Sequence, residues 1–98
     1  MWKMPFDIPD RIHRRLLEVC KSSGLSNVYI FGSRARGNST ASSDIDLAVE
    51  QELPPHVKSA LDDAAGFLKI DIVELPFVDN EYLLESISKD KVLFYPEK

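Results

Sequence analysis

The chain has 98 residues, of which 44% are hydrophobic and 29% charged, and its formal net charge is -4. This length and composition predict a single globular domain, residues 1–98, and exclude collagen-like, coiled-coil and disordered classes. The acidic balance also argues against stable binding to duplex nucleic acid, because such affinity comes mainly from neutralising phosphates with basic side chains.

The first predicted element is a helix over residues 9–23, which begins at Pro9 and stops before Gly24. Its apolar positions recur at helical spacing and are Ile12, Leu16, Val19 and Cys20. The interleaved arginines, Arg11, Arg14 and Arg15, are expected to form a solvated face. Cys20 has no partner for an intramolecular disulfide, so we expect it to pack in the core.

Next comes "NVYIF" (27–31), a short β-branched and aromatic run that predicts a buried strand running into a tight turn at Gly32. "SRARG" can form a brief helical turn before Gly37. The polar loop "NSTASS" then leads to "DIDLAV" (44–49), where acidic and aliphatic residues alternate with the period of a strand.

The second half predicts a helix over residues 54–68, a strand over 69–75, a helix with Asp79 or Asn80 as its N-cap, and a last strand over 91–95. This order indicates an α/β or α+β fold in which helices cover a small sheet.

The Gly32-Ser33 turn is a candidate phosphate-binding site. A strand that ends in Gly-Ser before a helical turn leaves backbone N–H groups free for phosphate oxygens, and Arg34 or Arg36 could add charge-assisted hydrogen bonds. The alternative is an ordinary tight turn. A P-loop is excluded because Asn38 occupies the position of its lysine.

Three aspartates are candidate metal ligands. Asp44 and Asp46 would point to the same face of a strand, with Cα atoms about 6.6 Å apart, and Ile45 and Leu47 would face the core. Like charges held this close favour a hard cation such as Mg²⁺. If the strand of Asp71 is the neighbour, all three could bind two ions that align an in-line displacement at phosphorus; otherwise they are solvated acids.

The combination of "GSRARG", "SDIDL" and "KIDIV" resembles the minimal nucleotidyltransferases of the DNA polymerase beta-like superfamily. The likeness covers nearly the whole chain and implies a small mixed sheet of about four strands flanked by helices. It further implies that Gly32 and Ser33 hold a nucleoside triphosphate, that Asp44 and Asp46 bind Mg²⁺, and that Asp71 completes the metal site and assists deprotonation of an acceptor hydroxyl.

The resemblance also implies a reaction and a partner. Members of this size often pair with a helical HEPN-domain protein as antitoxin to an RNase toxin, and some transfer AMP from ATP to a tyrosine of that partner. So short a chain has little surface with which to recognise an acceptor, so a partner or a second subunit is expected. The alternatives are a non-catalytic module that neutralises the partner by contact, and a phosphatase or other metal hydrolase, for which the nucleophile arrangement is missing.

Other residues are expected to be structural. His13 and His56 lack a second metal ligand at helical spacing. The aromatic residues Trp2, Phe6, Phe77 and Tyr82 are expected in the core or as its lid, and the alternative is a patch for a partner. No apolar run approaches the roughly 20 residues of a membrane span, and "MWKMPFDIPD" lacks the apolar middle of a secretory signal, so we expect a cytoplasmic protein.

Overall fold

A computed structural model describes residues 8–40 and 42–96. The helices are α1 (Asp10–Ser22), α2 (Ser33–Arg36), α3 (Pro55–Ala64), the 3-10 helix η1 (Leu75–Phe77) and α4 (Glu81–Asp90), and the strands are β1 (Val28–Phe31), β2 (Ile45–Val49), β3 (Ile70–Glu74) and β4 (Val92–Tyr95). Every helix and strand expected from the sequence is therefore present.

The four strands form one mixed sheet in the order β3-β2-β1-β4. β1 runs antiparallel to both β2 and β4, whereas β2 and β3 run parallel. The parallel pair requires a crossover connection, which α3 provides. This mixed sheet confirms the α+β class and makes β3 an edge strand beside β2.

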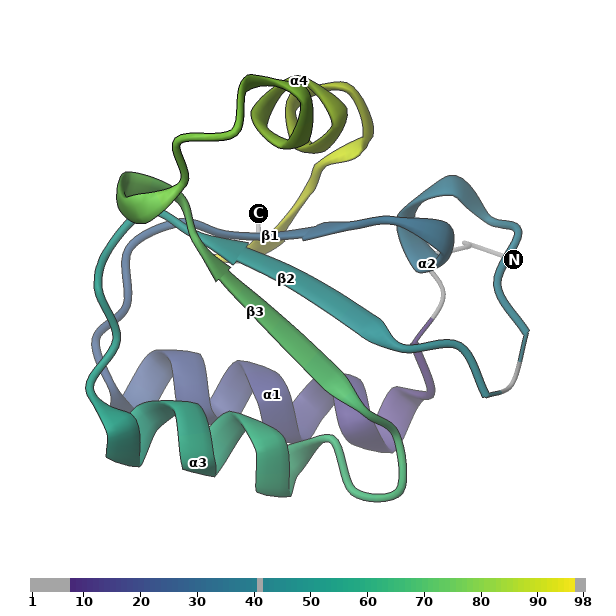
Figure 1. The fold of residues 1–98 in the computed structure, drawn as a ribbon. Helices are drawn as coiled ribbons and strands as arrows, with labels where there is room; N and C mark the ends of the chain where they lie inside the picture. Colours follow the sequence, from purple (N-terminus) through teal and green to yellow (C-terminus); the bar gives the residue numbers. More distant parts are fainter. Residues whose placement is uncertain (1–7, 41, 97–98) are drawn as a thin grey trace.

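The core lies between one face of the sheet and the pair α1 and α3, which run side by side beneath it in Figure 1. The alternation of β2 directs Ile45 and Leu47 into this core, where both are fully buried, as the sequence predicts. α4 lies beyond the opposite face of the sheet. The residues of β2 between the core positions therefore face the side of the sheet that carries α4.

Helix ends follow local chemistry. Asn80, rather than Asp79, is the N-cap of α4, because its Oδ1 accepts hydrogen bonds from the Tyr82 and Leu83 backbone N–H groups at 3.0 and 3.2 Å. The predicted helix over 54–68 is too long: α3 ends at Ala64, and the chain turns through Gly66 at a φ of 64°. That left-handed backbone favours glycine and stops the helix.

The prediction for the aromatic residues is wrong where it can be assessed. Phe77 is 64% exposed and Tyr82 is 86% exposed, because η1 and the first turn of α4 lie outside the packed face of the sheet. Trp2 and Phe6 lie outside the described residues. Phe94 is buried and its ring lies 5.1 Å from that of His13, so His13 is a structural residue as expected.

Cys20 is fully buried in the core, and burial raises the pKa of its thiol to about 12. Among the described residues there is no helix that combines the length and apolar character needed to span a membrane.

Candidate active site

The pairing of β2 with β3 places Asp46 directly opposite Asp71. On its other side Asp46 pairs with Phe31, the last residue of β1. Side chains of register partners lie on the same face of a sheet, so the two carboxylates share the face opposite the core. Asp46 is partly buried, and Asp71 is exposed because β3 is the edge strand. The two strands thus bring this pair of acids together.

The turn after β1 lies against the same carboxylate. Gly32 has φ 77° and ψ -156°, a backbone conformation essentially restricted to glycine. A Cβ atom at this position would collide with the Asp46 carboxylate oxygen. The Gly32-Ser33 turn and Asp46 are therefore in immediate contact, which explains why the chain needs glycine here.

Repulsion among the acids is visible in the electrostatics of Asp46. Burial raises the pKa of its carboxyl above the ordinary value, and the charges of Asp71 and Asp44 raise it further. The nearby Arg36 acts in the opposite direction. The surroundings of Asp46 therefore disfavour its ionised form, and a cation bound beside it would relieve that cost.

Asp44 lies one residue before β2 rather than within it. The Ile45 N–H still donates to the Lys69 carbonyl at 2.9 Å, so the chain becomes extended immediately after Asp44. The prediction that Asp44 and Asp46 share a regular strand is therefore wrong by one residue. Asp44 nevertheless contributes to the field at Asp46 and belongs to the same acidic group.

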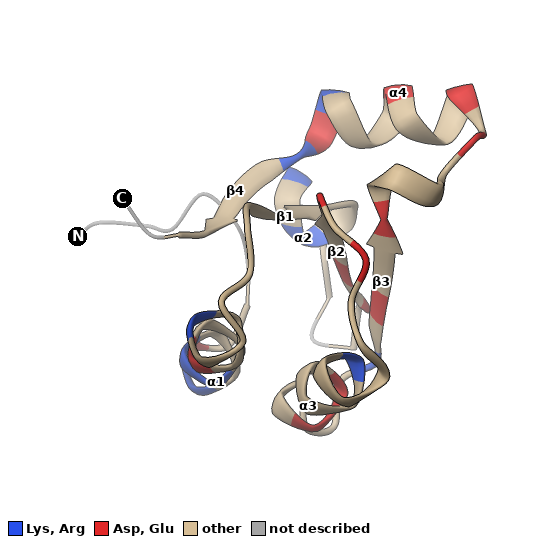
Figure 2. Ribbon diagram, turned by 90° about the vertical axis from the view of Figure 1, so that its left-hand side faces the viewer, with Lys and Arg blue, Asp and Glu red and all other residues tan. Residues whose placement is uncertain are grey.

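The two arginines of α2, either of which is a candidate phosphate ligand by sequence with an acid or solvent as the alternative, have different surroundings. Arg34 is only 2% exposed and donates hydrogen bonds to the Ser43 and Thr40 carbonyls, so the structure directs it at the loop before β2. Arg36 is exposed, and its Nη1 pairs with the Asp90 carboxylate at 2.7 Å. Figure 2 shows α2 below the junction of α4 and β4.

Sequence reasoning missed Asp90. It ends α4, where an acidic residue is unfavourable for the helix dipole unless a cation lies close by. That misplaced charge was the one signal that a basic partner exists. Through this ion pair the end of α4 is tied to the turn that carries Gly32 and Ser33.

Among the residues that the structure describes, no three His, Cys, Asp or Glu side chains are grouped closely enough to hold a metal ion. The structure therefore pairs Asp46 with Asp71 and keeps Asp44 nearby, but these described residues do not form the predicted three-aspartate cation pocket. The donor chemistry still fits a hard divalent cation, because carboxylate oxygens are the ligands such ions prefer and the charges of Asp71 and Asp44 raise the pKa of Asp46.

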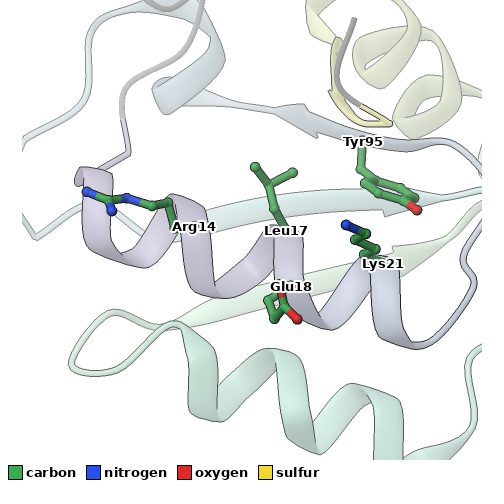
Figure 3. Close-up of a pocket in the computed structure, with 5 residues that line it drawn as sticks. All are labelled: Arg14, Leu17, Glu18, Lys21 and Tyr95. Carbon is green, nitrogen blue, oxygen red and sulfur yellow. The ribbon is translucent and has the colours of Figure 1, made fainter.

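A hollow of about 290 Å³ lies elsewhere, between α1 and β4 (Figure 3). The residues that line it are Arg14, Leu17, Glu18, Lys21 and Tyr95. It opens beside α1, on the core side of the sheet, whereas Asp46 faces the other side. Its mixed charges indicate no single ligand, and it contributes nothing to the acidic site.

Comparison with known proteins gives the family. The sequence profile described as "Polymerase beta, Nucleotidyltransferase" matches residues 15–98. The chain belongs to this nucleotidyltransferase family. The matched region contains the Gly-Ser turn and all three aspartates, so the resemblance read from the motifs is confirmed.

One relative is similar to this chain in sequence, and two solved structures are similar in fold. "Putative protein adenylyltransferase MJ0128" of Methanocaldococcus jannaschii is 34% identical over 88 residues, which cover 84% of this chain and 87% of that protein. The chain superposes on a toxin-antitoxin protein crystallised with AMP-PNP with a TM-score of 0.68 and 20% identity, over 88% of this chain and 74% of that one. A toxin-antitoxin MntA-HpeT mutant gives 0.60 and 14% over the same shares. These two structures show that the chain shares their fold.

Proposed function

We propose that this family member is a divalent-metal-dependent nucleotidyltransferase that transfers AMP from ATP to a hydroxyl group of a partner protein. The observation that carries the proposal is the close approach of Asp46, the register partner of Asp71, to Gly32 in the Gly32-Ser33 turn. Membership of the family, together with a relative named as a protein adenylyltransferase, supports this reaction class and this kind of acceptor.

Each part of the site has a role in this reaction. Backbone N–H groups of the Gly32-Ser33 turn and the Ser33 hydroxyl would donate hydrogen bonds to the triphosphate. Asp44, Asp46 and Asp71 would hold one or two Mg²⁺ ions, whose charge offsets the negative charge that develops on the attacking and leaving oxygens. Arg36, which is exposed and pairs with Asp90, would neutralise a phosphate oxygen, and its charge at Asp46 supports this role.

The acceptor step uses Asp71. Its carboxylate is exposed at the sheet edge, so a hydroxyl from outside the chain can reach it. Asp71 would accept the proton of that hydroxyl as its oxygen attacks the α-phosphorus. The bond from the α-phosphorus to the bridging oxygen breaks, pyrophosphate leaves, and AMP remains on the acceptor.

The transfer is tested by incubating the chain and its candidate partner with Mg²⁺ and ATP labelled in the α-phosphate. We expect label on the partner with the unchanged chain, and loss of transfer with Asp46→Ala. Asp62→Ala is the matched control, because Asp62 is exposed on α3. Transfer at the unchanged rate by Asp46→Ala would refute the assignment of the site.

We further propose that the partner is a HEPN-domain RNase toxin and that the modified residue is a tyrosine. The fold shared with toxin-antitoxin structures, one of them crystallised with AMP-PNP, supports a partner and an adenine nucleotide. Mass spectrometry of the partner after incubation with ATP is expected to show a mass gain of whole AMP units on a tyrosine. A gain on another residue, or on the chain itself, would overturn this assignment.

A non-catalytic module that covers the partner is the second candidate. It is favoured by the exposed apolar side chains of Phe77, Tyr82 and Leu83 on η1 and α4, which are available for contact. Expression of the toxin together with the Asp46→Ala chain separates the two functions. Continued protection of the cells would support neutralisation by contact, and lost protection would support modification.

A further inference from the structure

Arg34 is an internal cation next to the acidic site, and it donates hydrogen bonds to main-chain oxygens of the loop before β2. Its Nε donates to the Ser43 carbonyl at 3.1 Å, and its Nη2 donates to the same oxygen at 2.9 Å and to the Thr40 carbonyl at 3.4 Å. Arg34 is only 2% exposed, so its guanidinium is shielded from water. These hydrogen bonds are therefore needed to offset the cost of its desolvation.

The segment that Arg34 contacts closes on itself. The Thr40 N–H donates to Ser43 Oγ at 2.8 Å, and the Ser43 N–H donates back to the Thr40 carbonyl at 3.1 Å. These two bonds tie Thr40 to Ser43, and the guanidinium binds both of their carbonyls from inside. The main chain is therefore fixed at Ser43, immediately before Asp44.

Asp44 depends on this anchor because it lies outside β2. On its C-terminal side the chain is held by the bond from the Ile45 N–H to the Lys69 carbonyl. On its N-terminal side, the Ser43 carbonyl belongs to the same planar peptide unit as the Asp44 N–H. Fixing that carbonyl with two donors fixes the plane from which Asp44 projects.

We propose that Arg34 is a positioning residue that sets the place of the Asp44 carboxylate, and that it does not bind nucleotide. Arg34 lies on α2, directly after the Gly32-Ser33 turn, so one side chain couples that turn to the start of β2. The proposal rests on the proposed function, because it matters for activity only if Asp44 is a metal ligand. Residues that orient ligands typically change metal affinity or activity about 10- to 100-fold when altered.

The test compares Arg34→Lys with the unchanged chain. Lysine keeps the charge but cannot donate to both carbonyls in a fork. We expect Mn²⁺ affinity, measured by electron paramagnetic resonance of the free ion in the presence of AMP-PNP, to fall about tenfold. The affinity for AMP-PNP at saturating Mn²⁺ should change little. Weakened AMP-PNP binding at saturating Mn²⁺ with unchanged Mn²⁺ affinity would show that Arg34 holds the nucleotide, and would overturn the proposal.

Backbone hydrogen exchange tests the mechanical part without metal or nucleotide. In Arg34→Lys the Ser43 and Ile45 amides, which flank Asp44, should exchange faster, while the Leu47 amide in the middle of β2 should not. If the Ser43 and Ile45 amides exchanged at the same rate in Arg34→Lys as in the unchanged chain, the proposal would be overturned. If the unchanged chain bound no Mn²⁺, the proposed function would fail, and the exchange result would still decide the role of Arg34.

A second variant leaves the buried cation in place, in case Arg34→Lys does not fold. Ser43→Ala removes the Oγ atom that accepts from the Thr40 N–H, and should produce the same changes to a smaller degree. Ser42→Ala is the matched control, because the exposed Ser42 has a single long hydrogen bond among the described residues, to Thr40 Oγ1 at 3.4 Å. Equal effects of the two serine substitutions would contradict a specific role for the anchor at Ser43.

Discussion

Gly32, in the turn after β1, lies so close to Asp46 on the neighbouring strand β2 that no Cβ atom fits between them. The residue at position 32 therefore controls both the path of the turn and the position of a carboxylate. Neither constraint depends on the reaction, since one is backbone geometry and the other is steric. Both act on the same site.

Gly32→Ala should lower stability and abolish nucleotidyl transfer. The backbone conformation alone costs about 1 to 3 kcal/mol for a residue other than glycine, and the added methyl group also displaces the Asp46 carboxylate. Thermal unfolding and the transfer assay measure the two effects. Gly24→Ala is the control, because Gly24 also has positive φ but open space around it. It should lose stability and keep activity.

Asp46→Asn should raise the melting temperature of the metal-free chain at neutral pH, although transfer is lost. Burial and the charges of Asp71 and Asp44 all disfavour the ionised carboxylate, and asparagine removes that charge at nearly the same size. Differential scanning calorimetry in a chelating buffer measures the change. A lower melting temperature for Asp46→Asn would show that the carboxylate is already compensated within the chain.

At the scale of elements, Glu74 connects three segments at the end of β3. Its Oε2 accepts from the Leu53 N–H at 2.9 Å, and its Oε1 pairs with Lys58 on α3 at 2.8 Å. The hydrogen bond and charge of Lys58, and then the Leu53 N–H, hold the pKa of Glu74 below its ordinary value. Because Glu74 binds its proton less readily in the folded chain, it stabilises the fold above the ordinary carboxyl pKa.

Glu74→Gln should therefore lower the melting temperature by a few degrees at neutral pH. This contribution of the carboxylate is lost as pH falls through the lowered pKa of the folded chain, so the difference between the two proteins should shrink below about pH 4. Melting curves from pH 3 to 7 test the prediction. A difference that does not depend on pH would mean that Glu74 acts through packing alone.

The sequence predicted these elements well because each has a local cause. The apolar spacing of α1, the glycine after β1 and the alternation of Ile45 and Leu47 are all readable without neighbours. Strand order is different, since the meeting of Asp46 with Asp71 depends on pairing between residues far apart in the chain. The sequence predicts that meeting only on the condition that the strand of Asp71 pairs with the strand of Asp46.

In the candidate site, too, the contacts between residues far apart in the chain could not be predicted from local patterns. The contact of Gly32 with Asp46 and the ion pair of Arg36 with Asp90 depend on packing between elements, so no local pattern could reveal them. Arg34 lies two residues from Gly32 and has the charge expected of a phosphate ligand. Its direction into the loop carbonyls is set by tertiary structure, and residue type alone suggested the opposite.

At the scale of the whole molecule, the two sides of the sheet differ in how they are covered. α1 and α3 cover one face over a continuous core, while the outer surface of η1 and α4 leaves large apolar side chains in solvent. Solvated apolar side chains contribute little to folding. They remain available for association.

Tyr82→Ser should change the free energy of unfolding by less than about 0.5 kcal/mol, because Tyr82 is 86% exposed. The contrasting substitution, Phe94→Ala, removes a buried ring and should cost about 3 to 5 kcal/mol. Urea unfolding of both variants measures this contrast. A large loss of stability for Tyr82→Ser would mean that this surface is packed in solution.

The lone thiol in the middle of the core has a practical consequence. Cys20 is fully enclosed, and its high pKa keeps the reactive thiolate scarce, so an alkylating reagent can label a molecule only after its interior has opened. Each labelled chain thus records one opening event. The rate of Cys20 alkylation, followed by intact mass, therefore measures how often the core between the helices and the sheet opens. No introduced probe is needed.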